Sequence, residues 1–227
     1  MTELTEDAFR AVDSYLTDVL VGHDPLLEAA VADQEAAGLP AIEVAPLNGK
    51  LLHLIARMSG ARRILEIGTL GGYSTIWLAR AVGAEGRVVS IEAEPDNAAV
   101  ARANLQRAGV ADRVEVREGR AAEVLPTLAG EPAFDLVFID ADKQSNTLYL
   151  DWAARLGRPG TVVVVDNVVR SGEVANTATE DELVIGVQRG LEMLRDDPRF
   201  DATAVQTLDS KGWDGVALAL VVEPPAS

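Results

Sequence analysis

The sequence contains no cysteine, and aromatic residues make up only 4% of its 227 positions. The lack of cysteine excludes disulfide bonds, thiolate-bound zinc and a cysteine nucleophile. The two histidines, His23 and His53, show no paired spacing, and we expect both to be structural. No apolar run approaches the length that a membrane-spanning helix needs, so no membrane partner is expected.

Positive charge is also scarce in this chain. Lysine and arginine number 20 against 36 aspartates and glutamates, which gives a net charge of −16 at pH 7. Such a surface repels the phosphates of nucleic acids and anionic lipids, so neither is an expected partner. The segment Met1–Asp13 lacks the basic and then apolar pattern of a secretory signal. The composition therefore predicts a soluble, cytoplasmic protein.

The length and the 48% hydrophobic content fit one globular domain over residues 1–227. Residues 1–40 are expected to form a helical extension, and residues 60–222 a core built on a sheet. The extension and the segment after it show apolar residues at helical spacing. The helices predicted from this spacing cover residues 6–20, 25–37 and 47–59.

Strand and helix patterns alternate after residue 60, which is typical of βαβ units and a mainly parallel sheet. The predicted strands cover residues 64–67, 87–92, 114–117, 136–140 and 161–166, and the helices 74–82, 95–108, 121–128, 146–156 and 182–195. Two last strands, at 202–208 and 216–222, predict an antiparallel hairpin at the sheet edge. We therefore expect an α/β, Rossmann-like fold with a mainly parallel seven-stranded sheet and helices on both faces.

The run Arg62–Thr75 combines a short apolar strand, a glycine-rich turn and the start of a helix. Gly68, Gly71 and Gly72 permit positive φ and allow a ligand to approach the bare backbone. The N–H groups at the start of the following helix, near Ser74, would point into this turn. The run therefore predicts a nucleotide-like ligand at the carboxyl end of the first parallel strand.

The turn differs from the dinucleotide fingerprint, because Leu70 and Tyr73 stand where G-x-G-x-x-G requires glycine. Glu66, inside the strand, would repel a pyrophosphate and attract a cationic ligand. The pattern therefore favours S-adenosylmethionine over NAD. The alternative is an ordinary turn after a strand that ends in an acid.

Another acid follows the second predicted strand, at the edge where a parallel sheet places its ligands. Glu92 could bind both hydroxyls of a ribose, and the turn at 118–121 could border an adenine ring. The alternative for Glu92 is a solvated strand end without a ligand.

Asp140 ends the fourth predicted strand, Asp166 ends the fifth, and Asn167 comes directly after it. If these strands are neighbours, about 5 Å apart, the three side chains converge. Oxygen ligands without sulfur or imidazole suit a hard cation, Mg²⁺ in the first place and otherwise Mn²⁺ or Ca²⁺. An incomplete shell leaves positions for water or substrate oxygens, as in a catalytic metal site. Alternatively, each aspartate caps the helix that follows it.

Together, the run 65–75, Glu92 and the segments 140–143 and 166–167 resemble the cation-dependent O-methyltransferases of the caffeoyl-CoA and catechol type. The resemblance is strongest to the small bacterial members, and it extends over nearly the whole chain through the segments 44–50 and 211–215. It implies an S-adenosylmethionine site built by Val44, Glu66, Gly68, Thr69, Ser74, Glu92, Ala121, Asp140 and Asp142. It implies a divalent metal held by Asp140, Asp166 and Asn167, and Lys143 and Asp140 as the catalytic residues.

The implied reaction moves a methyl group from S-adenosylmethionine to one of two vicinal hydroxyls on a small aromatic acceptor, and the resemblance also implies a homodimer. Arg120 and Ser171 depart from the residues of plant members, which argues against an acceptor linked to CoA. Tyr149, Trp152 and Trp213 are candidates for the pocket. The alternative functions are an NAD-dependent oxidoreductase and a non-catalytic cofactor-binding protein.

Overall fold

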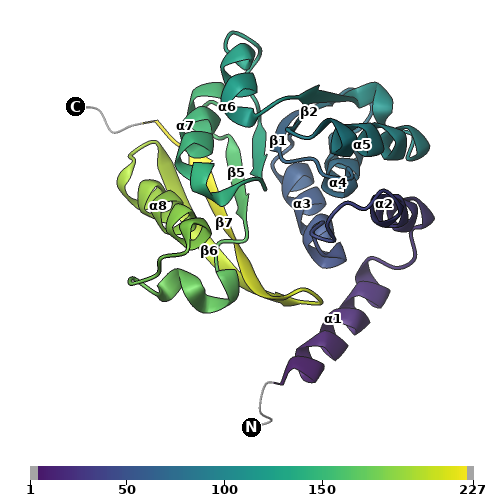
Figure 1. Ribbon diagram of the computed structural model, residues 1–227. Helices are drawn as coiled ribbons and strands as arrows, with labels where there is room; N and C mark the ends of the chain where they lie inside the picture. The colour runs from purple at the N-terminus through teal and green to yellow at the C-terminus, as the bar shows by residue number, and fades with distance from the viewer. Residues whose placement is uncertain (1–4, 224–227) are drawn as a thin grey trace.

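The computed structural model of the protein describes residues 5–223, and its seven strands form a sheet in the order β3-β2-β1-β4-β5-β7-β6 (Figure 1). Strands β1 to β5 run parallel, and β1 pairs with both β2 and β4. The chain order reverses between β1 and β4, which is where open α/β sheets bind their ligands. The strands are β1 Arg63–Ile67, β2 Arg87–Glu92, β3 Val114–Glu118, β4 Leu136–Ile139, β5 Val162–Asp166, β6 Phe200–Asp209 and β7 Gly212–Val221.

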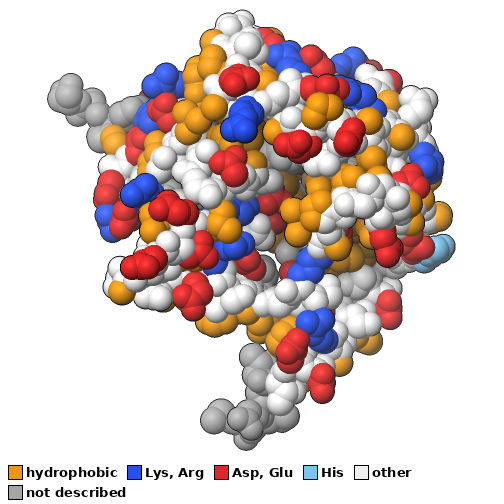
Figure 2. Space-filling view, viewed as in Figure 1, with side chains coloured by type: hydrophobic (Ala, Val, Ile, Leu, Met, Phe, Trp, Pro, Cys, Tyr) orange, Lys and Arg blue, Asp and Glu red, His pale blue; other side chains and the backbone are white. Residues whose placement is uncertain are grey.

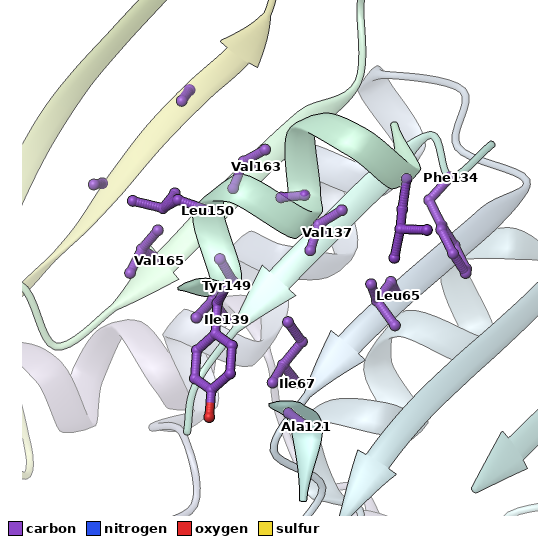
Figure 3. Close-up of a cluster of buried hydrophobic side chains, with 14 of the residues drawn as sticks. Leu65, Ile67, Ala121, Phe134, Val137, Ile139, Tyr149, Leu150, Val163 and Val165 are labelled. Carbon is purple, nitrogen blue, oxygen red and sulfur yellow. The ribbon is translucent and has the colours of Figure 1, made fainter. Parts of the chain in front are cut away.

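Helices cover both faces of the sheet, so its central strands are apolar on both sides. The residues Ile64–Ile67 and Val163–Asp166 are all buried. One face packs against α2 Pro25–Ala36, α3 Pro46–Met58, α4 Tyr73–Val82 and α5 Pro95–Arg107. The other packs against α6 Ala121–Val124, α7 Asn146–Leu156 and α8 Glu182–Asp196. Figure 3 shows this second core, in which Leu150 of α7 appears near Val163 and Val165 of β5, and Tyr149 of α7 near Ile139 of β4.

The predicted fold class is confirmed, and the strand and helix bounds agree with the sequence patterns to within a few residues. The helix expected over 121–128 is an exception, because α6 ends at Val124 and a 3₁₀ helix follows over Leu125–Leu128. Pro126 accounts for the change, since it has no backbone N–H to donate to an α-helical hydrogen bond.

The hairpin at the edge of the sheet has the expected form. Strand β7 pairs antiparallel with both β5 and β6. Its tip connects the sheet edge to the N-terminal helices, because the N–H of Ser210 donates to Asp13 at 3.0 Å and Lys211 Nζ donates to Glu43 Oε1 at 2.8 Å. The hairpin therefore fixes the segment that precedes α3.

The first helix, α1 Glu6–Leu20, projects from the body of the molecule in Figure 1. Its apolar stripe matches the helical spacing of the sequence, yet Val12, Tyr15 and Val19 are 57%, 66% and 59% exposed. Within the described residues 5–223, no helix has the length and apolar content needed to cross a membrane.

Candidate active site

A cavity of about 800 Å³ lies across the carboxyl ends of strands β1 to β5. The turns after these strands form its floor, and the segment between α2 and α3 forms one wall. Most of the residues predicted for the cofactor site line it, namely Val44, Gly68, Thr69, Ser74, Glu92, Ala121, Asp140 and Asp142. Lys143 and Asn167 line it as well, whereas Glu66 and Asp166 do not.

The turn after β1 requires glycine at two of its positions. Gly68 has φ 101°, and a Cβ there would overlap the carbonyl group of Asp140 on the neighbouring strand. Gly72 has φ 85° and directly precedes helix α4. The sequence suggested a positive φ at Gly71, but the left-handed residue between Gly68 and Gly72 is Leu70 (φ 49°). Gly71 is small for another reason, because the side chain of Gln34 fills the space beside it.

Glu66 lies beneath the cavity and is fully buried. Its carboxylate accepts hydrogen bonds from the hydroxyl groups of Ser74 (2.6 Å), Thr75 (2.5 Å) and Ser90 (2.6 Å). Burial raises the pKa of Glu66 to about 7, although these three donors favour the charged form. The structure therefore differs from the expectation of direct contact with a cationic ligand: Glu66 holds Ser74, and Ser74 lines the cavity.

We expect wild-type protein to lose stability relative to a Glu66→Gln variant as the pH rises from about 5 to about 8. Because the folded-state pKa of Glu66, about 7, lies above its usual 4.5, the folded state binds more protons in this window than the unfolded state. The free energy of unfolding falls with rising pH by up to about 3 kcal/mol, at about 1.36 kcal/mol per pKa unit. Urea denaturation of both proteins across this range measures the difference, and a constant difference would contradict the raised pKa.

Glu92 lies in the cavity wall and is held by backbone donors. Its Oε2 accepts from the N–H groups of Thr69 (3.2 Å) and Leu70 (2.7 Å) in the glycine turn. Its Oε1 accepts from the N–H of Glu94 (3.0 Å) and from the side-chain amide of Asn97 (3.4 Å). These donors fix the position of the carboxylate beside the turn.

Asp140 and Asp166 follow adjacent strands and stand next to each other, because Ile139 of β4 pairs with Val165 of β5. Lys143 is 7% exposed, and its Nζ donates to Asp140 Oδ1 at 2.9 Å. Asp166 is 6% exposed, and burial together with the negative charge of Asp140 raises its pKa to about 7. The site therefore concentrates negative charge that one lysine offsets only in part.

Asn167 is the third predicted metal ligand, and its backbone conformation is unusual. Its φ is 59°, in the left-handed region that asparagine tolerates better than most residues. Its N–H donates to Asp166 Oδ1 at 2.8 Å, so the two residues form one tight turn. Asp166 faces a small pocket beside α3 that adjoins the cavity through Val44.

This donor set fits a hard divalent cation by its chemistry. In the described part of the chain, no three Asp, Glu, His or Cys side chains gather in a group that could hold a metal. The predicted set uses two carboxylates and takes its third oxygen from the amide of Asn167. Two adjacent carboxylates and an amide oxygen are the kind of oxygen ligands that Mg²⁺ or Ca²⁺ prefers.

The candidate aromatic residues separate in the structure. Tyr149 lines the cavity and donates a hydrogen bond from its hydroxyl group to Asp142 Oδ1, and Asp142 also accepts from the hydroxyl group of Ser145. Burial and this bond raise the pKa of Tyr149. Trp152 packs against the core of the α7 face, and Trp213 lies outside the cavity lining. Neither of these tryptophans is therefore a cavity residue.

Several cavity residues were missed in the sequence, among them Gln34, Arg170 and Leu183. Gln34 is buried in α2, and its amide donates to Pro40 O and Glu43 Oε2, both at 2.7 Å. No motif marks it, because it reaches the site only through the packing of α2 on the glycine turn. Arg170 comes shortly after Asp166 and Asn167, but its own residue type gave no sign of a place in the cavity.

The Rossmann-like sheet, the acid and glycine turn after β1 and the acid at the end of β2 define a methyltransferase that uses S-adenosylmethionine. The chain belongs to the O-methyltransferase family, whose model matches residues 21–220. It is thus an S-adenosylmethionine-dependent O-methyltransferase, and the oxidoreductase and non-catalytic alternatives are wrong.

Similar proteins support this assignment along nearly the full length. The chain is 58% identical to a catechol O-methyltransferase of Mycobacterium tuberculosis, with 92% of this chain and 94% of the relative covered. It is 46% identical to a catechol O-methyltransferase of Niastella koreensis, over 96% of this chain and all of the relative. An O-methyltransferase structure from Bacillus cereus in complex with SAH superposes with a TM-score of 0.93 at 50% identity, covering 96% of this chain and 100% of that chain.

Proposed function

We propose that the protein is a divalent-cation-dependent O-methyltransferase that acts on a catechol-like acceptor with two vicinal hydroxyl groups. The observation that carries this proposal is the pair of Asp140 and Lys143 in the cavity lining, with the buried Asp166 next to Asp140 at the end of the adjacent strand. The names of the two catechol O-methyltransferase relatives agree with such an acceptor. The net charge of −16, with acidic side chains spread over the face that Figure 2 shows, argues against a nucleic acid or an anionic membrane as a partner. We expect a cytoplasmic location.

In this proposal, S-adenosylmethionine lies along the turns after β1 and β2 and supplies a methyl group bound to a positively charged sulfur. Glu92 accepts hydrogen bonds from the ribose hydroxyl groups. The acidic side chains at this end of the sheet favour the positive charge on the sulfur of the cofactor. Glu66 acts from below by holding Ser74 in place. The lining residues assigned to the cofactor are Val44, Gly68, Thr69, Ser74, Glu92, Ala121, Asp140 and Asp142.

The acceptor lies at the other end, beside Lys143. Asp140, Asp166 and Asn167 would hold the divalent cation, which lowers the pKa of a hydroxyl group bound to it. Lys143 Nζ takes the proton from the reacting hydroxyl group, and its bond to Asp140 fixes the amine beside the site. Because Lys143 is buried, the proton transfer is shielded from bulk water.

A comparison of acceptors tests this function. Catechol should be methylated in the presence of Mg²⁺, whereas phenol and resorcinol, which lack a vicinal pair of hydroxyl groups, should give turnover lower by about two orders of magnitude or more, as expected when orientation is lost. Equal turnover of catechol and phenol would contradict the proposal, because a single hydroxyl group would then suffice.

We expect Glu92→Ala to weaken the binding of S-adenosylmethionine by roughly 10- to 150-fold, since a hydrogen bond to a charged group contributes about 1.5–3 kcal/mol. Isothermal titration calorimetry measures this affinity. Glu85→Ala, which removes an exposed acid just before β2, is the matched control. The substitution also removes the acceptor of the N–H groups of Thr69 and Leu70. Circular dichroism checks that the variant is still folded without these two hydrogen bonds. Unchanged affinity would remove Glu92 from the site.

We also propose a homodimer, in which the exposed stripe of α1 (Val12, Tyr15 and Val19) packs against a second copy. Light scattering at micromolar concentration should give twice the mass of the chain, 24.1 kDa. Replacing Val12 and Val19 together by glutamate should shift the mass toward that of a monomer, because the charges would be buried in the interface. Asp7→Lys on the same helix is the control, and a monomeric wild-type protein would contradict the proposal.

A further inference from the structure

Arg170 carries a guanidinium group in the cavity that has no acidic partner within residues 5–223. It lines the cavity and is half-buried. Its Nε is buried and makes no hydrogen bond, and its side chain forms no ion pair in the described structure. A buried polar donor without a hydrogen-bond partner is unfavourable, so a ligand that accepts a hydrogen bond from this guanidinium would be bound more tightly.

Eleven arginines in residues 5–223 form ion pairs with aspartates or glutamates. Arg170 differs from the other arginines without an ion pair in these residues, because it is half-buried and they are all exposed, including Arg120 at the cavity. Asp140 pairs with Lys143, and Asp214 accepts from the backbone N–H groups of Val169 and Arg170, so neither acid forms an ion pair with the guanidinium of Arg170 in the described structure. The positive charge of Arg170 is therefore available to a ligand.

A rigid turn holds the backbone of Arg170. Arg170 and Ser171 have φ of 55° and 54°, a left-handed conformation that residues other than glycine rarely adopt because it is sterically unfavourable. Asp214 Oδ1 stabilises the turn by accepting the N–H groups of Val169 (3.0 Å) and Arg170 (3.1 Å). Gly172 packs on the ring of Trp213, where a Cβ would come within 2.7 Å. Such strain in a cavity wall is typical of a functional position.

The sheet order places Arg170 at the acceptor end of the cavity. Arg170 follows β5, and Glu92 ends β2, which is three strands away in the order β2-β1-β4-β5. At about 4.8 Å for each spacing, the ends of β2 and β5 are separated by roughly 14 Å. Arg170 comes four residues after the end of β5 and therefore belongs to the end of the cavity opposite to the ribose acid, where the cofactor does not extend in the proposed arrangement.

We propose that Arg170 selects acceptors that carry a carboxylate in addition to the two vicinal hydroxyl groups. A guanidinium binds a carboxylate through two parallel hydrogen bonds, which fix the orientation of the aromatic ring as well as its affinity. The acceptor class is then a dihydroxylated aromatic acid instead of a neutral catechol. This inference rests on the proposed function, because it assigns the substituent of the same acceptor.

The test compares kcat/KM for 3,4-dihydroxybenzoate and for catechol in four proteins: wild type, Arg170→Met, Arg170→Lys and Arg189→Met. Arg189 is exposed on α8 outside the cavity, and its variant controls for the loss of one positive charge. In Arg170→Met, the ratio of kcat/KM for the acid to that for catechol should fall roughly 10- to 150-fold, the value of a hydrogen bond to a charged group. Arg170→Lys should retain part of the ratio, and Arg189→Met all of it.

A binding measurement separates this inference from the proposed function. The dissociation constant of 3,4-dihydroxybenzoate, measured by calorimetry in the presence of S-adenosylhomocysteine and Mg²⁺, should rise in Arg170→Met even if no acceptor is turned over. In that case the proposed reaction would be wrong while the role of Arg170 stood. An unchanged ratio together with an unchanged dissociation constant would overturn the inference. A loss confined to the affinity for S-adenosylmethionine would overturn it as well, since Arg170 would then bind the cofactor.

Discussion

Replacing Lys143 by methionine is expected to lower kcat for catechol by about 10²–10⁴-fold, the usual share of general-base catalysis. A base has to be neutral when it accepts a proton. The Nζ of Lys143 donates to Asp140 Oδ1 at 2.9 Å, and the side chain is buried, so the amine is held in one place beside the reacting hydroxyl group. A divalent cation would lower the pKa of a hydroxyl group bound to it and so make that proton available to Lys143.

Two further measurements distinguish a base from a structural lysine. The binding of S-adenosylmethionine and of the metal should survive in Lys143→Met, and the loss of kcat should be smaller for nitrocatechol, whose hydroxyl groups ionise more readily. Lys50→Met is the control, because Lys50 lies over the ring of Trp77 on the α3 face of the sheet, outside the cavity. A variant that keeps near-normal kcat on catechol would show that Lys143 is not the base.

Removal of the metal should abolish turnover. We expect EDTA to reduce catechol methylation by at least about 10³-fold, since the loss of a charge-stabilising group at a reacting oxygen costs several kcal/mol. Mg²⁺ or Mn²⁺ should restore the activity. Full activity in EDTA, with the metal content of the protein measured in the same sample, would refute the proposed site.

Asp166→Ala should be inactive even at saturating S-adenosylmethionine, because the metal serves the acceptor and not the cofactor. Calorimetry should show that the variant still binds S-adenosylmethionine. Asp166→Asn helps to separate folding from catalysis, since the raised pKa of Asp166 means that burial already disfavours its charge. This variant should keep its thermal stability and still lose turnover. The exposed Asp201→Asn is the control for a lost carboxylate.

The order of strands and helices was predictable because each element has a clear period. Strand β2 and helices α1 and α7 have the predicted bounds, since the apolar spacing that predicted each of them begins and ends with the element. The antiparallel hairpin of β6 and β7 was recognisable from the glycine-containing turn residues between the two predicted strands. What the sequence could not show was the packing of α2 on the turn after β1, which makes Gly71 necessary for a reason unrelated to its φ.

The site was predictable to the extent that it follows the ends of parallel strands. Asp140 and Asp166 were expected to be neighbours, and the register of β4 and β5 places them so. The environment of Glu66 was not predictable, because its three hydroxyl partners come from β2 and α4 and meet only in the folded protein. Arg170 was missed because neither its left-handed backbone nor its lack of an acidic partner leaves a pattern in the sequence.

The central claim is metal-dependent methyl transfer to a vicinal hydroxyl group, and one labelling experiment tests it directly. The protein is incubated with catechol and S-adenosylmethionine carrying a deuterated methyl group, with Mg²⁺ or with EDTA, and the products are analysed by mass spectrometry. The account predicts catechol carrying a single deuterated methyl group in the Mg²⁺ sample and unmodified catechol in the EDTA sample. Equal labelling in both samples, or none in the presence of Mg²⁺, would contradict it.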